Sequence, residues 1–429
     1  MPYRTTQCIA LLLTIAVAQN STAATPEKDW PTFRGPSRTA VSSDQDLLEK
    51  WSEDGPKLLW ETDGLGRGYS SLAIADGKIY TMGDSIDGGD GTDEYLLSFD
   101  QKTGEQLWKL KTGPGWMNGN EAWQSSRSTP TVDGDRVYVL TAHGKLICAN
   151  IEGEEIWSKN LKEDFQGKKA DGWGYSESVL IDGEKLVVTP GGTKNTMVAL
   201  EKMTGETIWT TIRDNDRGAG HASTLITNIG GTKVYVTTTG SGAMGVRARD
   251  GKLLWSYEID KTTAVIPTPI VRNDLVFFAA GYKRGGALLK QVPSQAEGEV
   301  TIEEIYPINP DLANKHGGIL LIGDHLYGDS DDKGIPFCAD LMTGKVLWKG
   351  RSQKGRKSAS IVAADGHVYF RFSNGFLALV EATPEEYNEV SIFEVPGSGE
   401  RPSWSHPVIT GGKLYLREGS KLLCYDLQG

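Results

Sequence analysis

The hexapeptide TGEQLW at residues 103–108 is one of a series of similar segments that decide the fold. In each segment a glycine is followed four residues later by a tryptophan. The other copies are EGEEIW at 152–157, TGETIW at 204–209, DGKLLW at 250–255 and TGKVLW at 343–348, and GPKLLW at 55–60 is a variant with one extra residue. A segment that recurs with so little change indicates a chain built from structural repeats.

The spacing of these segments gives the size of the repeat. Consecutive tryptophans stand 46 to 52 residues apart, except for the 93 residues between Trp255 and Trp348. That gap fits one degenerate copy, in which we expect Tyr306 to replace the tryptophan. Phe393 is expected to do the same in a further copy after Trp348.

A second series of motifs has the same period. Each unit contains a pair of residues suited to a tight hairpin turn, flanked by alternating apolar residues. The eight pairs are Asp76-Gly77, Asp133-Gly134, Asp182-Gly183, Gly230-Gly231, Asn273-Asp274, Gly323-Asp324, Asp365-Gly366 and Gly411-Gly412. Units of roughly 45 to 50 residues with about four short strands are typical of propeller blades. We therefore predict an all-β fold, an eight-bladed β-propeller of four-stranded antiparallel blades.

The two ends of the chain complement each other. The last segment, residues 413–429, supplies inner strands but stops before any strand of the Gly-x-x-x-Trp type. KLLWET at 57–62 is such a strand, and it precedes any complete unit. We expect the Trp60 strand to join the eighth blade, so that N- and C-terminal strands close the ring and remove free sheet edges.

Composition narrows the range of functions. The chain has 429 residues, 52 of them glycine, and a net charge of −11, with no run of lysine or arginine. A nucleic-acid partner is not expected, because phosphate neutralisation requires a concentrated basic face. Glycines spread along the whole length suit many turns in one large β domain, which we expect at residues 57–429.

The N-terminus has the pattern of an export signal. Arg4 precedes an apolar stretch from Cys8 to Ala18, and small residues follow at 21–23. We predict a signal peptide at residues 1–24 and an N-terminal extension at 25–56. The apolar stretch is too short to span a bilayer, and no later stretch is long enough. The mature protein is expected to be exported to the periplasm or the extracellular space, without a membrane span and as a monomer.

The repeat resembles that of the PQQ-repeat superfamily of propellers. The shared pattern is a hydrophobic strand with Ala or Cys before Asp, Asn or Glu, followed by TGexxW, and it covers nearly everything from Trp60 to Gly429. The segment DWPTFRGPSR, Asp29 to Arg38, resembles the opening of exported bacterial proteins with PQQ-like repeats. The superfamily contains quinoprotein alcohol dehydrogenases and the outer-membrane assembly factor BamB. The resemblance therefore implies the propeller fold, and either PQQ with calcium or a protein partner in the envelope.

The cysteines separate this chain from the well-studied enzymes of that superfamily. Cys148, Cys338 and Cys424 occupy one repeat position in blades that are not neighbours, so no two of them are expected to form a disulfide. We expect buried free thiols. The vicinal disulfide of quinoprotein alcohol dehydrogenases has no counterpart, and the Cys-x-x-Cys-His motif that attaches haem c is missing.

A candidate site follows from aligning the eight units. In a propeller the first strand of each blade lines the central channel, so the residues at the strand starts form a ring. The predicted ring is Tyr69, Arg127, Ser176, His221, Ile266, His316, Ser358 and Trp404, with Glu177 and Lys357 brought in by a shift of one residue. Asp171, Trp173, Tyr175 and Arg217 lie close by in sequence. Polar and aromatic groups that converge at a concave mouth indicate a ligand site.

We assign expected roles on this basis. Glu177 and His221 lie on neighbouring blades and are the candidate catalytic acid–base pair. The expected ligand-binding residues are Tyr69, Arg127, Trp173, Tyr175, Arg217, His316, Lys357 and Trp404. Arg127 and Lys357 suit an anionic ligand such as a carboxylate or an ortho-quinone. A calcium site would need Glu177 with oxygens from Asp311 and Asn314, and zinc would need ligands beyond His221 and His316.

Three functions stay open at this point. The first is a quinoprotein-like oxidoreductase that acts on an alcohol or sugar bound at the channel mouth. The second is a non-enzymatic, BamB-like scaffold that binds an envelope protein. The third is a hydrolase or lyase that uses Glu177 and His221. The composition of the ring favours an enzyme, whereas the missing vicinal cysteines and haem motif favour a scaffold.

Overall fold

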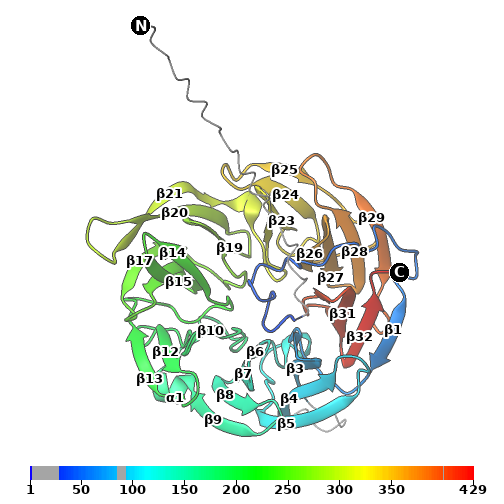
Figure 1. Ribbon diagram of the computed structural model, residues 1–429, viewed down its shortest axis with the longest axis horizontal. Coiled ribbons are helices and arrows are strands. Elements are labelled where there is room, and N and C mark those ends of the chain that lie inside the picture. The colour runs from blue at the N-terminus through cyan, green and yellow to red at the C-terminus, as the bar shows by residue number, and fades with distance from the viewer. Residues whose placement is uncertain (2–28, 85–92, 400) are drawn as a thin grey trace.

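The computed structural model describes residue 1 and residues 29–84, 93–399 and 401–429, and the predicted signal peptide lies outside them apart from Met1. The described strands form eight four-stranded antiparallel sheets arranged as a ring, which confirms the predicted eight-bladed propeller (Figure 1). Each blade follows the chain outward from the central channel, so the first strand of a blade lies innermost.

Blades 1 to 4 comprise the following strands: β2 (Ala73–Ala75), β3 (Lys78–Asp84), β4 (Asp93–Asp100) and β5 (Gln106–Pro114); β6 (Thr131–Asp133), β7 (Arg136–Leu140), β8 (Lys145–Asn150) and β9 (Glu155–Asn160); β10 (Leu180–Asp182), β11 (Lys185–Val188), β12 (Met197–Glu201) and β13 (Thr207–Thr211); β14 (Leu225–Ile229), β15 (Thr232–Thr239), β16 (Gly242–Arg247) and β17 (Leu253–Glu258).

Blades 5 to 8 comprise these strands: β18 (Ile270–Arg272), β19 (Leu275–Ala280), β20 (Gly285–Pro293) and β21 (Val300–Asn309); β22 (Leu320–Ile322), β23 (His325–Asp329), β24 (Pro336–Asp340) and β25 (Val346–Lys349); β26 (Ala359–Ala364), β27 (His367–Phe372), β28 (Phe376–Glu381) and β29 (Glu389–Glu394); β30 (Val408–Thr410), β31 (Lys413–Glu418), β32 (Lys421–Asp426) and β1 (Leu58–Thr62). Short helical turns are η1 (Glu121–Trp123), α1 (Leu161–Phe165) and η2 (Pro310–Leu312).

Ring closure occurs as predicted from the two ends of the chain. β1 pairs antiparallel with β32, with Trp60 opposite Cys424. The outer strand of blade 8 therefore comes from the N-terminal part of the chain (Figure 1). Cys148, Cys338 and Cys424 are free and buried, in agreement with the repeat argument.

The glycine and the tryptophan of the repeat motif pack against each other between neighbouring blades. The tryptophan of one blade covers the motif glycine of the next, so that a Cβ on Gly104 would lie 2.6 Å from the Trp60 ring. The equivalent pairs are Trp108 with Gly153, Trp157 with Gly205, Trp209 with Gly251, Tyr306 with Gly344 and Phe393 with Gly55. The last two pairs confirm that Tyr306 and Phe393 replace the tryptophan. The repeat thus encodes contacts between blades.

We expect Gly104→Ala to lower the free energy of unfolding by about 1–3 kcal/mol more than Gly77→Ala, because only the first methyl group would overlap an indole ring. The control is matched in backbone strain, since φ is +76° at Gly104 and +74° at Gly77. A Cβ at Gly77 would meet nothing within 4 Å. Urea denaturation of both variants measures the difference, and equal values would show that Trp60 does not require a glycine there.

An N-terminal strap, residues 29–56, runs through the centre of the ring before it reaches β1 (Figure 1). Trp30 forms two backbone hydrogen bonds with Ile74 at the edge of blade 1. Further along, the N–H of Ser42 donates to the carbonyl of Ala363, whose N–H donates to the carbonyl of Ala40. Residues that the sequence places before the propeller are therefore bonded to its innermost strands.

Candidate functional site

The residues predicted at the strand starts surround one cavity of about 420 Å³ in the central channel. The prediction of their place along the chain was wrong, because those that line the cavity lie in the extended connection four residues before the first strand of each blade; the term strand-start position is kept for them. Seven of the eight predicted positions line it, and Lys357 takes the place of the eighth, Ser358. The lining ring residues are Tyr69, Arg127, Ser176, His221, Ile266, His316 and Trp404. The cavity has the size of a pocket for a small organic molecule.

A series of hydrogen bonds, here called the girdle, joins neighbouring blades two residues after each strand-start position. At this position the backbone N–H of one blade donates to the serine or threonine hydroxyl at the same position of the next blade, at 3.1 to 3.2 Å. The pairs are Ser71 to Thr129, Thr129 to Ser178, Ser178 to Ser223 and Ser223 to Thr268. Such bonds fix the spacing of the inner strands and therefore the position of the side chains above them.

The strap forms the floor of the pocket where the girdle lacks hydroxyl groups. Gly318 and His406 occupy the equivalent positions in blades 6 and 8, and both line the pocket with Phe33 and Arg34 of the strap. The ring centroids of Phe33 and His406 are 4.9 Å apart. Arg34 Nη2 donates to the carbonyl of Ile319 at 2.7 Å, and a Cβ at Gly318 would lie 2.6 Å from Arg34. A side chain at Gly318 would therefore displace the end of Arg34, at a position whose φ of +73° already favours glycine.

Aromatic rings cover two sides of the pocket. Trp404 stacks on His316 with ring centroids 4.3 Å apart, and Tyr69 lies 4.8 Å from Trp404. On the other side, the planes of Trp173 and Tyr282 are within 7° of parallel, with centroids 6.3 Å apart. Flat apolar faces of this kind suit a planar or ring-shaped ligand.

The charges in the lining are mainly positive. Arg34, Arg127, Lys315 and Lys357 line the pocket, whereas Asp332 is the lining carboxylate among the described residues and pairs with Lys315 at 3.0 Å. Burial lowers the pKa of Arg127 to about 10, which leaves it charged at neutral pH. The pocket therefore favours an anion.

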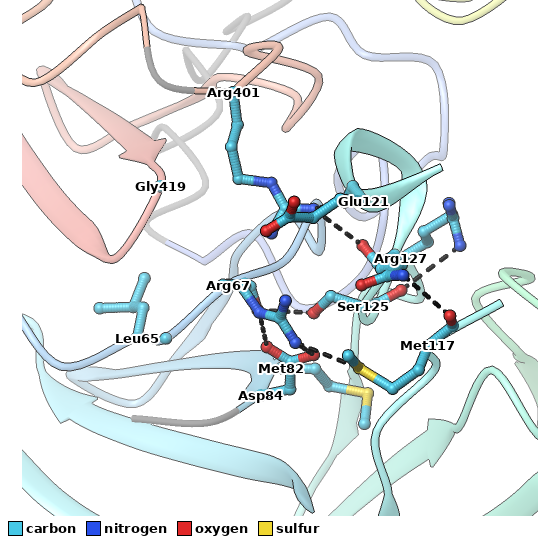
Figure 2. A network of polar contacts seen from close by, with 12 residues as sticks. Leu65, Arg67, Met82, Asp84, Met117, Glu121, Ser125, Arg127, Arg401 and Gly419 are labelled. Carbon is cyan, nitrogen blue, oxygen red and sulfur yellow. Dashed lines mark hydrogen bonds and ion pairs between the residues drawn. The ribbon is translucent and has the colours of Figure 1, made fainter. Parts of the chain in front are cut away.

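A polar network shapes the wall between blades 1 and 2 (Figure 2). Arg67 forms an ion pair with the buried Asp84 at 3.0 Å, and its carbonyl accepts a hydrogen bond from the Ser125 hydroxyl. Arg127 Nη1 donates to the carbonyl of Ser125, and Arg401 donates to that of Glu121 in η1. These contacts hold the η1 turn, whose Ala122 and Trp123 line the pocket.

His221 has two hydrogen-bonding partners. Its Nδ1 lies 2.6 Å from the Ser176 hydroxyl, and its Nε2 lies 2.8 Å from Asp171 Oδ2. Burial, together with the nearby Lys169, lowers the pKa of His221, whereas Asp171 opposes that shift. Burial disfavours the ionised form of Asp171, but His221 and Lys169 hold its pKa well below the usual range. His221 is therefore neutral and Asp171 ionised at pH 7.

Three predicted site residues do not line the pocket. The Glu177 carboxylate accepts hydrogen bonds from the Thr189 N–H at 2.8 Å and from the Thr224 hydroxyl at 3.2 Å, and burial raises its pKa to about 7. The Tyr175 hydroxyl donates to the carbonyl of Pro190, and Arg217 donates to that of Ile259. The carboxylate partner of His221 is Asp171 rather than Glu177.

Sequence reasoning missed several lining residues. Tyr282 and Trp123 lie in connections between strands, where no repeat register applies. Lys315 directly precedes His316, which could have indicated it. Phe33 lies in the segment DWPTFRGPSR, which precedes the first repeat and so has no position in the repeat alignment.

The expected calcium donors do not converge. The Glu177 carboxylate is engaged by Thr189 and Thr224. Asp311 pairs with Lys349 at 2.8 Å, and Asn314 Nδ2 donates to Asp329. Across the described residues, no group of three or more His, Cys, Asp or Glu side chains could hold a metal ion. The calcium set that the resemblance implied therefore does not fit this geometry.

Comparison with known proteins places the chain in a family. The family model described as outer membrane protein assembly factor BamB matches residues 19–118 and 93–350. The chain belongs to this BamB family. No curated protein sequence matches the chain.

Solved structures similar to this BamB-family chain include a BamB protein and two alcohol dehydrogenases. BamB from Moraxella catarrhalis has a TM-score of 0.57 and 15% identity, covering 87% of this chain and 98% of its own. Quinohemoprotein alcohol dehydrogenase from Comamonas testosteroni has a TM-score of 0.62 and 12% identity, with 95% and 81% covered. A europium-containing methanol dehydrogenase has a TM-score of 0.64 and 12% identity, with 91% and 89% covered. At these identities the similarity shows the fold alone.

Among the residues that the structure describes, no helix is long and apolar enough to cross a membrane.

Proposed function

We propose that this BamB-family propeller binds a small anionic molecule with a flat or ring-shaped body in its central pocket. The observation that carries the proposal is the combination of cations and aromatic faces around one cavity. Arg127, Lys315 and Lys357 would neutralise carboxylates, and Trp173 and Trp404 would stack on the body of the ligand. The predicted export signal and membership of the BamB family support a location in the cell envelope.

Two ligand sources share this chemistry, an acidic saccharide and the quinone PQQ. PQQ is a planar ortho-quinone that carries carboxylates, so the cations and the aromatic faces suit it. When bound, it would supply the electron acceptor for oxidation of an alcohol or sugar. The proposal includes no calcium, because the expected donors are engaged elsewhere.

The proposed roles follow the placement of the side chains. Tyr69, Arg127, Trp173, His316, Lys357 and Trp404 are proposed to contact the ligand. Glu177, Tyr175 and Arg217 do not line the pocket and are proposed to hold the lining residues in place, through their hydrogen bonds to Thr189, Pro190 and Ile259. His221 is proposed as the acid–base residue, held by Asp171.

Membership of the BamB family supports an alternative, the binding of a protein partner. The exposed apolar side chains that could serve such a partner include Leu107, Ile156, Ile208 and Leu347, each directly before a motif tryptophan. They belong to the outer strands of different blades, so they are spread around the rim. Apolar side chains scattered singly are common on soluble proteins and do not define a docking patch. The pocket is therefore the better supported site.

Titration of the purified chain with PQQ, and separately with glucuronic acid, tests the proposal. We expect saturable quenching of tryptophan fluorescence by one of them, because Trp123, Trp173 and Trp404 line the pocket. Arg127→Ala should weaken binding at least 10-fold, since it removes a charge-assisted hydrogen bond of about 1.5–3 kcal/mol.

Arg249→Ala is the control, because that side chain is 62% exposed and does not line the pocket. Its affinity should equal that of the unmodified chain. Absence of saturable quenching by either ligand, or equal weakening in both variants, would overturn the proposal and leave partner binding as the function to test.

A further inference from the structure

Ser176, His221 and Asp171 form a continuous hydrogen-bonded series at the edge of the pocket. The Ser176 hydroxyl lies 2.6 Å from His221 Nδ1, and His221 Nε2 lies 2.8 Å from Asp171 Oδ2. Ser176 and His221 both line the cavity. We propose that these residues are a nucleophilic triad, and that the propeller hydrolyses a small ester bound in the pocket.

The propeller geometry builds this arrangement from three separate segments. Ser176 and His221 occupy the same strand-start position in blades 3 and 4, so the ring places their side chains next to each other. Asp171 lies in the connection before β10, where its Oδ1 accepts a hydrogen bond from the N–H of Trp173 at 3.1 Å. The side chains of Asp171 and His221 are only 5% and 6% exposed. A triad requires a base held in this way by a buried carboxylate.

The protonation states suit the proposed roles. Asp171 is ionised and accepts a hydrogen bond from the Nε2–H of the neutral His221, which leaves Nδ1 free to accept the hydroxyl proton of Ser176. Lys169 stabilises the Asp171 carboxylate from 3.9 Å. Ser176 is partly exposed and therefore reachable from the pocket.

A second histidine–serine pair in the same ring provides an internal comparison. His316 Nδ1 lies 2.9 Å from the Ser358 hydroxyl, which resembles the distance at Ser176. His316 stacks on Trp404, and no carboxylate among the described residues contacts its Nε2. Burial lowers its pKa to about 3. Without a carboxylate the pair is not expected to activate its serine.

The reaction follows from these positions and conserves every atom. Ser176 Oγ bonds to the ester carbonyl carbon while its proton passes to His221 Nδ1. The bond from that carbon to the alkoxy oxygen breaks, and the leaving alcohol takes the proton. Water then attacks the acyl-serine with His221 as base, releases the acid and returns a proton to Ser176 Oγ.

Arg127, which lines the same pocket at the equivalent position of blade 2, is proposed to stabilise the negative charge that develops on the carbonyl oxygen. Its Nη1 donates to the carbonyl of Trp173 at 2.7 Å, which holds the guanidinium on the same wall as Ser176. The substrate class rests on the proposed function of the pocket. It is an O-acyl ester on a small anionic, ring-bearing molecule such as an acidic saccharide.

A fluorophosphonate probe tests the nucleophile without knowledge of the natural ester. The full chain is incubated with the probe, and the adduct is located by mass spectrometry. We expect one adduct per chain, on Ser176, through loss of fluoride. Ser176→Ala should abolish labelling, whereas Ser358→Ala should label like the unmodified chain. Hydrolysis of p-nitrophenyl acetate should follow the same pattern.

Absence of an adduct on Ser176, or equal labelling of Ser176→Ala and the unmodified chain, would overturn the proposal. Thermal melting of each variant establishes that it is folded. The PQQ and glucuronic acid titrations of the unmodified chain distinguish two failures: absence of labelling with binding intact refutes the triad alone, whereas absence of binding refutes the proposed function of the pocket.

Discussion

Replacing Arg38 with alanine is expected to lower the free energy of unfolding by about 3–5 kcal/mol, because three buried carbonyls would lose a charged hydrogen-bond donor, at a cost of about 1–3 kcal/mol for each acceptor left unpaired. The Arg38 guanidinium donates to the carbonyls of Ser178, Val179 and Thr224, all on innermost parts of blades 3 and 4. Its charge also stabilises the ionised form of Glu177, which is buried beside it. The alanine variant would leave these carbonyls and the carboxylate without their donor and counter-charge.

Chemical denaturation measures this loss, and Arg249→Ala is the matched control. Arg249 is an exposed arginine whose ion pair with Asp250 spans 3.5 Å, so its removal should change stability by no more than about 0.5 kcal/mol. A similar small effect at Arg38 would show that the strap is an attachment to the propeller, and that the ring folds without it.

The strap links the stability of the propeller to the shape of the pocket. Phe33 and Arg34 form part of the lining, and Arg38 anchors the same segment four residues later. A weakened anchor should therefore also weaken ligand binding, because the floor would no longer be held against Gly318. Stability and binding are coupled through this segment.

The fold could be predicted from the sequence because the repeat encodes contacts between blades. The motif requires a glycine, since the ring of the preceding tryptophan covers that position. The contact needs only a flat aromatic ring, which explains why Tyr306 and Phe393 can replace the tryptophan. Hairpin turns fixed the number of units, and the pairing of β1 with β32 follows from the incomplete units at the two ends. These are local patterns repeated at constant spacing.

The site could be predicted only in part, because some of its side chains occupy repeat positions and others lie in irregular connections. Strand-start positions repeat with the blades, so Tyr69, His221 and Trp404 could be placed around the channel. Neighbouring residues in an extended chain point to opposite sides, and this separates Ser176, in the lining, from Glu177, behind it. Asp171 lies in an irregular connection that no period describes.

The second large effect concerns Asp171, which acts through His221 as a positioning residue. Asp171→Asn is expected to slow fluorophosphonate labelling of Ser176 by about 10²–10⁴-fold, because the amide can donate to Nε2 and so favour the wrong tautomer of the imidazole. The Ser176 hydroxyl would then face a protonated Nδ1, which cannot accept its proton. Labelling rates of the two proteins at pH 8 measure this effect.

The pH dependence separates this role from a purely structural one. Labelling requires neutral His221, so its rate should fall as the pH drops through the pKa of His221, below the ordinary value of about 6.5. The charged groups that act on His221 are Asp171, which raises that pKa, and Lys169 and Arg127, which lower it. Removing the Asp171 charge must therefore move the midpoint to lower pH, while Asp332→Asn, a change to a lining carboxylate paired with Lys315, should leave it in place. An unchanged midpoint in Asp171→Asn, with a rate within a few-fold of the unmodified chain, would mean that the carboxylate only packs against the imidazole and that Ser176 has no activated base.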